Sequence, residues 1–132
     1  MVVTQRNGGS PHASVVNAGV LAHPVTSEPV VAFAARGVVM KLANLRVRPH
    51  LTVVFRSGWE WVAVEGDVDL AGPDDRLVGF DASNLSRLLR EIYATAAGGT
   101  ADDWAELDEV IAAERHTAVL IRPARLYSNP GE

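Results

Sequence analysis

The stretch ARGVVMKLANLRVRP, residues 35–49, connects two strongly apolar segments and decides how the chain is organised. Residues 40–48 consist largely of good helix formers, and the helix is expected to end at Pro49, whose ring disfavours helical backbone at the preceding residue. Lys41 stands at the start of this short helix. It is the only lysine in the sequence, in which the other basic residues are all arginine.

The segments before this helix predict three strands. Residues 2–6 are typical of a strand, and the Asn-Gly-Gly-Ser sequence of residues 7–10 tolerates the positive φ of a tight hairpin. Residues 12–21 are expected to return as one strand, up to a polar turn between Pro24 and Pro29. Residues 29–36 follow as a third strand that is too apolar for simple alternation, which predicts burial on both faces.

The segments after the helix predict a hairpin followed by helices. Residues 50–56 and 59–70 predict a long antiparallel pair joined through Ser57-Gly58. The hydrophobic period then becomes helical. The apolar residues with helical spacing are Leu85, Leu88, Leu89 and Ile92 in a first helix, and Leu107 and Ile111 in a second.

Residues 117–123 predict a last core strand, and residues 124–132 are expected to form a tail. Strands in succession, one inserted helix and a helical pair before the final strand are typical of an α+β, mainly-β fold. The pattern predicts one domain over residues 1–132, built as a small closed or split barrel.

Composition excludes several classes of function. The chain of 132 residues has no cysteine, which excludes disulfides, thiolate catalysis and zinc–sulfur sites. A net charge of −4 argues against nucleic-acid binding, which normally needs a basic face. No apolar run approaches the roughly 18 residues of a membrane span, and the N-terminus does not resemble a secretory signal. The expected protein is cytoplasmic, with no membrane or nucleic-acid partner.

The sequence contains no strong catalytic constellation. The 4 histidines, His12, His23, His50 and His116, have no HxH or HExxH spacing, so no metal site is expected. There is no GxSxG, GxGxxG or Walker lysine motif. Catalytic residues are therefore left unassigned. A protein that binds a redox cofactor needs no acid–base pair of its own, because the cofactor carries the electrons.

Lys41 fits a cofactor-binding role. An ammonium group in the first turn of a helix opposes the helix dipole, but beside free backbone N–H groups it can complete a phosphate site. Arg36 lies just before it, at the end of the third strand, and could reach the same anion. The alternative is that both side chains are solvated surface groups.

Several motifs together resemble a known family. The residues that carry the resemblance are GSPHASVVN (9–17), the strand ending in ARG (35–37), KLANLRVRPHLTVVF (41–55), WEWVAVEG (59–66) and the segment from Leu89 to Pro130. They are similar to the pyridoxamine 5′-phosphate oxidase-like split β-barrel superfamily, and more narrowly to its branch that uses the deazaflavin cofactor F-420. The likeness covers almost the whole chain.

This resemblance implies a six-stranded antiparallel split β-barrel with short helices that forms a homodimer, with cofactor sites between the subunits. By position it assigns Lys41 to the cofactor phosphate and places Ala34, Ala35 and Arg36 along the cofactor. Asn17 would face the ring system. Trp59 matches an aromatic residue near the cofactor or, equally, one that packs in the core or at the dimer interface. Asn44 is expected to brace the short helix.

Two features depart from the family pattern. Val39 occupies the position where many relatives have a second basic residue, and Val38 precedes it, so the phosphate pocket is expected to be less cationic. The sequence also begins directly with a strand, where relatives usually have a helix. Either the start is truncated or part of the cleft is left open.

The leading functional hypothesis is an F-420-dependent reductase that transfers hydride to a small organic acceptor. The first alternative is an FMN-dependent oxidoreductase on the same fold, in which Lys41 would bind the FMN phosphate. The second is a non-catalytic, cofactor-binding dimeric barrel, which Val38 and Val39 make plausible. The sequence does not identify the acceptor.

Overall fold

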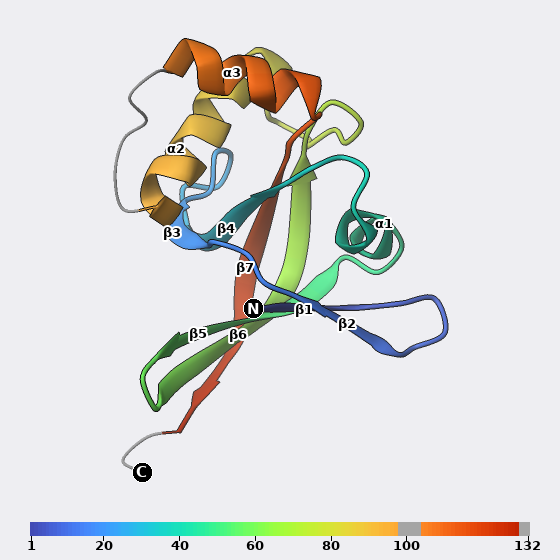
Figure 1. The fold of residues 1–132 in the computed structure, drawn as a ribbon, viewed down its shortest axis with the longest axis vertical. Helices are drawn as coiled ribbons and strands as arrows, with labels where there is room; N and C mark the ends of the chain where they lie inside the picture. Colours follow the sequence, from blue (N-terminus) through green and yellow to red (C-terminus); the bar gives the residue numbers. More distant parts are fainter. Residues whose placement is uncertain (98–103, 130–132) are drawn as a thin grey trace.

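A computed structural model describes residues 1–97 and 104–129. Its strands are β1 (Val2–Gln5), β2 (Pro11–Ser14), β3 (Gly19–Ala22), β4 (Pro29–Ala35), β5 (His50–Ser57), β6 (Glu60–Ala71) and β7 (Thr117–Ser128). Its helices are α1 (Met40–Val47), α2 (Leu85–Ala97) and α3 (Trp104–Ala113), with a 3₁₀ turn η1 (Ala82–Asn84) before α2. The described strands form one antiparallel sheet in the order β2-β1-β5-β6-β7-β4-β3 (Figure 1).

The expected six-stranded barrel is wrong in strand number and in closure, because the sheet has seven strands and remains open. The difference arises in residues 12–21, which do not form one strand. β2 pairs with β1, whereas β3 pairs with β4 at the opposite edge of the sheet. Residues 15–18 cross between the two edges, and Val15 is exposed. The α+β, mainly-β class is confirmed.

The segment expected to be a C-terminal tail continues β7 as far as Ser128. β7 pairs with β6 along its length, with a register irregularity between Glu65 and Gly66. A Cβ atom added at Gly66 would lie 2.0 Å from the carbonyl oxygen of Arg122, so this close approach of the two strands requires glycine. Because β7 pairs with β6 up to Ser128, the end of β7 and the β5–β6 hairpin project together beyond the body of the protein (Figure 1).

Both faces of the sheet bury apolar residues. On one face α1 contributes Leu42 and Leu45 to a core that includes Phe33 of β4. On the other face α2 and α3 cover Ala32 and its neighbours. Successive residues of β4 thus enter different cores, which confirms the predicted burial of this strand on both faces. Figure 1 shows α2 and α3 on one side of β4 and α1 beyond the end of that strand.

The predicted helices are confirmed where the described residues test them. Leu88, Leu89 and Ile92 of α2 are buried, as their spacing indicated. α1 is fixed to β1 by a buried polar contact, in which Asn44 Nδ2 donates to Thr4 Oγ1 at 3.0 Å. Asn44 therefore braces the short helix, as expected. Within the described ranges, no helix is long and apolar enough to span a membrane.

Candidate cofactor-binding site

A cavity of about 360 Å³ lies where β4 ends and α1 begins. Four of the six residues assigned by the family resemblance line it, namely Asn17, Ala34, Arg36 and Lys41. Asn17 comes from residues 15–18, which cross between the two edges of the sheet. Ala34 and Arg36 come from the end of β4, and Lys41 comes from the first turn of α1. Residues of α2 and of the turn between α3 and β7 form the rest of the wall.

The other two assigned residues do not line this cavity. Ala35 is buried in the core on the α1 face of the sheet, because side chains alternate along β4. Trp59 lies in the turn before β6 and is 90% exposed. Within one chain it therefore stands at the projecting hairpin and not at the cavity.

Lys41 is half-buried and lines this cavity. Lys41 Nζ donates a hydrogen bond to Ser14 Oγ, at the end of β2, at 3.4 Å. No carboxylate of the described residues lies within ion-pair distance of Lys41. Burial, and then the positive charge of Arg36, lower the pKa of the Lys41 ammonium from its ordinary value of 10.5. The charged form of Lys41 is therefore destabilised in this cavity, and a bound anion would stabilise it.

The N-terminus of α1 adds potential hydrogen-bond donors. Val39, the N-cap residue, has extended backbone and provides no side-chain cap. The first backbone N–H groups of a helix have no partner within the helix, and they carry the positive end of its dipole. Beside Lys41, they form the type of environment that binds a phosphate group.

The second cation of the site is partly neutralised. Arg36 Nη1 lies 3.6 Å from Glu114 Oε2, and the Arg36 side chain is 62% exposed. Val39 lines the cavity without adding charge, whereas Val38 is 93% exposed. The pocket is therefore weakly cationic, and Lys41 is its central charge.

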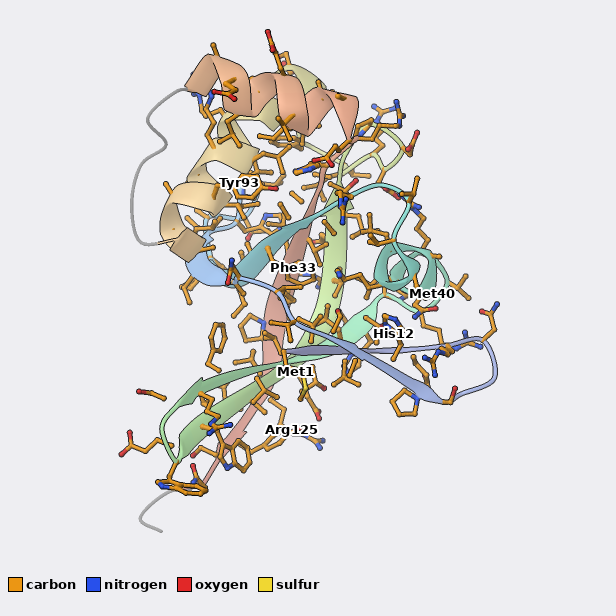
Figure 2. All side chains as sticks on the ribbon, in the orientation of Figure 1. Met1, His12, Phe33, Met40, Tyr93 and Arg125 are labelled. Atoms are coloured by element: carbon orange, nitrogen blue, oxygen red, sulfur yellow. The ribbon has the colours of Figure 1, made fainter. Side chains whose placement is uncertain are left out.

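A second polar group in the cavity was missed by the sequence analysis. The Tyr93 hydroxyl lies 2.5 Å from His116 Nδ1, and His116 Nε2 lies 3.1 Å from Glu114 Oε1. Tyr93 projects from α2 towards the sheet (Figure 2). Tyr93 follows Leu89 by four residues and so lies beside the apolar stripe of α2. This spacing was the one feature of the sequence that could have indicated Tyr93. His116 and Glu114 lie in the turn before β7, and no local motif marks them.

Burial, and then the nearby Glu114 carboxylate, raise the pKa of the Tyr93 hydroxyl above its ordinary value of 10.0. The phenol therefore keeps its proton at neutral pH and acts as a hydrogen-bond donor. His116 is buried, whereas Glu114 is reached by solvent. The cavity thus contains an anion-attracting ammonium and, separately, a half-buried proton-donating phenol.

Two further hollows adjoin this cavity on the side of the projecting hairpin, and the three together are here called the groove. A hollow of about 240 Å³ shares Val16, Asn17 and Ala96 with the cavity. This hollow shares Phe55 and Arg56 with a further hollow of about 430 Å³ that reaches Trp61. An elongated ligand with its phosphate at Lys41 could therefore lie along Asn17 towards Arg56.

The largest of the described cavities, about 560 Å³, lies elsewhere, around residues 72–85. Its acidic groups already have partners, because Asp75 pairs with Arg46 and Asp74 pairs with Arg115. In the described ranges, no group of three or more His, Asp or Glu residues is arranged to hold a metal ion. The groove at Lys41 is therefore the better candidate site.

No family profile matches the chain, and no curated protein sequence matches it. Solved structures do share its fold. A conserved hypothetical protein from Mycobacterium tuberculosis superposes with a TM-score of 0.69 at 17% identity, over 96% of this chain and 73% of that one. A pyridoxamine 5′-phosphate oxidase-related, FMN-binding protein from Nostoc punctiforme superposes with a TM-score of 0.65 at 12% identity, over 96% and 72%.

A protein described as an F420 reductase superposes with a TM-score of 0.59 at 15% identity, over 96% of this chain and 86% of that one. The class defined by these neighbours is the pyridoxamine 5′-phosphate oxidase-like fold. This chain has that fold, which confirms the resemblance found in its sequence at the level of the fold. The fold alone does not identify a cofactor or a reaction, which depend on the residues of the groove.

Proposed function

We propose that this protein is an F-420-dependent reductase that acts on a small organic acceptor. The observation that carries the proposal is the half-buried Lys41 ammonium, which lines a groove without an acidic partner among the described residues. When bound, F-420 would supply the carbon that exchanges hydride with the acceptor. The fold shared with a protein described as an F420 reductase supports the same reading.

The residues of the groove fit a phosphate-containing cofactor. Lys41, Ser14 and the free N–H groups of α1 would bind the phosphate, and charge-assisted hydrogen bonds of this kind are strong. Asn17 would face the ring system. Arg56, farther along the groove, would interact with the acidic tail that distinguishes F-420 from FMN.

The walls of the groove would orient the acceptor and exclude water. Ile92 and Ala34 provide apolar surface in the same cavity as Lys41. Such surface holds a reacting pair together without competing for its charge. The chain's own contribution is therefore binding, orientation and the exclusion of solvent.

FMN is the second candidate cofactor, because a structural neighbour is described as FMN-binding and FMN offers the same phosphate to Lys41. The weakly cationic pocket does not distinguish the two phosphates. Titrating the purified protein with each cofactor, followed by cofactor fluorescence, separates the candidates. Micromolar binding of F-420 and weaker binding of FMN is the expected result. Tighter binding of FMN would favour the flavin alternative, and binding of neither would favour a non-catalytic scaffold.

We also propose that the active form is a homodimer. The β5–β6 hairpin and the end of β7 expose a set of large aromatic side chains, here called the hairpin surface: Trp59, Trp61 and Tyr127. Trp59 is 90% exposed, and the Trp61 and Tyr127 rings are in edge-to-face contact. Aromatic residues exposed together in this way are typical of protein interfaces. A second copy packed on this surface would give Trp59 a partner.

A further inference from the structure

The Tyr93–His116–Glu114 network lines the cofactor cavity but has no part in phosphate binding. Its hydrogen-bond directions follow from its members. The Glu114 carboxylate only accepts, so His116 Nε2 carries a proton and donates it at 3.1 Å. In the neutral ring His116 Nδ1 is then an acceptor, and the Tyr93 hydroxyl donates to it at 2.5 Å. The three groups therefore form one directed chain from the cavity to Glu114.

Protonation of His116 reverses one step of this chain. The imidazolium carries a proton on each nitrogen, so Nδ1 donates to the phenol oxygen of Tyr93. The phenol proton is then free to point into the cavity.

The surrounding charges are few in the described structure. Glu114 also faces Arg36 across 3.6 Å, and the neighbouring Arg115 pairs with Asp74. Lys41 contributes the other charge that lines the cavity. Tyr93 is the titratable group that α2 contributes to the cavity wall, where it stands beside Ile92 and Ala96. A reacting molecule in this cavity would thus meet a half-buried phenol next to apolar surface.

We propose that Tyr93 is the proton donor to the acceptor and that His116 and Glu114 position and recharge it. This inference rests on the proposed function. Reduction adds hydride from the reduced cofactor to an acceptor carbon, and the electron pair displaced from the double bond moves to an acceptor oxygen. The O–H bond of Tyr93 breaks as its proton passes to that oxygen. The Tyr93 oxygen then takes the Nδ1 proton of the His116 imidazolium.

The step leaves His116 neutral, with its Nε2 proton still donated to Glu114. Between turnovers the Tyr93 hydroxyl passes its proton to His116 Nδ1 and takes another from water in the cavity, which restores the imidazolium. The acceptor class that fits is a neutral compound whose reduction leaves negative charge on oxygen. Such a compound receives a hydrogen bond from Tyr93 and apolar contact from Ile92.

The first test examines the network in the protein without cofactor. The ring nitrogen NMR signals of His116, identified by their loss in His116→Gln, should show a proton on Nε2 and a hydrogen-bonded Nδ1. Tyr93→Phe should shift the Nδ1 signal. Tyr127→Phe is the matched control, because the Tyr127 hydroxyl donates to Glu65, on β6, and not to histidine. A Nδ1 signal that is unchanged by Tyr93→Phe would overturn the proposal.

The second test separates binding from turnover. Tyr93→Phe should bind the cofactor with an unchanged Kd and lower kcat about 10²- to 10⁴-fold, the usual contribution of a general acid. His50→Gln is the control here and should change neither quantity, because His50 pairs with Asp67 outside the cavity and outside the hairpin surface. His116→Gln should lower kcat and remove one ionisation from its pH profile, again at unchanged Kd, and it provides an independent variant if Tyr93→Phe folds poorly.

The other outcomes are equally informative. Unchanged turnover in Tyr93→Phe and in His116→Gln overturns the proton-donor role and leaves the proposed function intact. A weakened Kd in Tyr93→Phe would make Tyr93 a cofactor contact, which also overturns it. If the wild-type protein binds neither F-420 nor FMN, the proposed function fails and the proton-donor role fails with it.

Discussion

Lys41 carries a positive charge where three features of the structure oppose it. Its side chain is half-buried, Arg36 adds positive potential, and the N-terminus of α1 points its dipole at the same region. No carboxylate of the described residues offsets them by an ion pair. A residue selected only for stability would be better placed elsewhere, which is why we assign Lys41 to an anionic ligand.

The first prediction is that the affinity for phosphate depends on pH. Because the pKa of free Lys41 is lowered from 10.5 and a bound anion would raise it again, anion binding takes up a proton between the two values. The affinity for inorganic phosphate should therefore fall as pH rises through the lowered pKa, below 10.5. Phosphate titrations followed by NMR at a series of alkaline pH values measure this dependence.

Lys41→Arg is the matched control for the pH prediction, because a guanidinium stays protonated throughout this range. Phosphate binding by this variant should not weaken with alkaline pH. If wild type and Lys41→Arg show the same pH dependence, Lys41 is not the group that binds the anion.

At the level of residues, sequence analysis predicted one side of the candidate site. Lys41 and Arg36 were recognisable because a lysine at a helix start and an arginine at a strand end follow each other closely. Tyr93 and His116 were not recognisable, since they meet only when α2 and the turn before β7 fold over the end of β4. No spacing along the chain reports contact between groups 23 residues apart.

Among the elements, the β6–β7 pair depends on Gly66. A Cβ atom at this position would lie 2.0 Å from a backbone oxygen that cannot move as a side chain can. We therefore expect Gly66→Ala to lower the free energy of unfolding by about 1–3 kcal/mol or more. Gly8→Ala is the control, because a Cβ there would meet nothing within 4 Å and its φ is not positive.

Urea denaturation of the two alanine variants and of the wild type measures this difference. Equal loss of stability in Gly66→Ala and Gly8→Ala would contradict the close strand approach. It would also remove the reason why β7 can follow β6 past the register irregularity to Ser128.

The two wrong predictions about strands have the same physical cause. Periodicity reports local burial but not which strands pair, so residues 12–21 were expected to form one strand, although their two ends pair at opposite edges of the sheet. The exposed end of β7 has no buried residues from Arg122 onwards and was therefore expected to be a tail. β4 was predicted correctly, because burial on both faces leaves a continuous apolar run.

For the whole molecule, the hairpin surface predicts association. We expect wild-type protein to sediment as a dimer and the double variant Trp59→Ser/Trp61→Ser to sediment as a monomer, because it removes both tryptophans of that surface. Val78→Ser is the control, since Val78 is 84% exposed outside the hairpin surface. Analytical ultracentrifugation distinguishes these states.

A wild-type protein that stays monomeric at all accessible concentrations would contradict the proposed homodimer. A Val78→Ser variant that dissociates as completely as the double variant would place the interface elsewhere. Neither result would bear on the proposed phosphate site at Lys41, which is tested separately.

The most direct test of the central claim is the affinity of wild type and Lys41→Ala for F-420 and for FMN, measured by fluorescence titration near neutral pH. Losing a hydrogen bond to a charged group costs about 1.5–3 kcal/mol, so Lys41→Ala should bind the cofactor about ten- to hundredfold more weakly. Lys41→Arg should retain most of the affinity. Binding of equal strength by wild type and Lys41→Ala would contradict the assignment of Lys41 as the phosphate-binding residue.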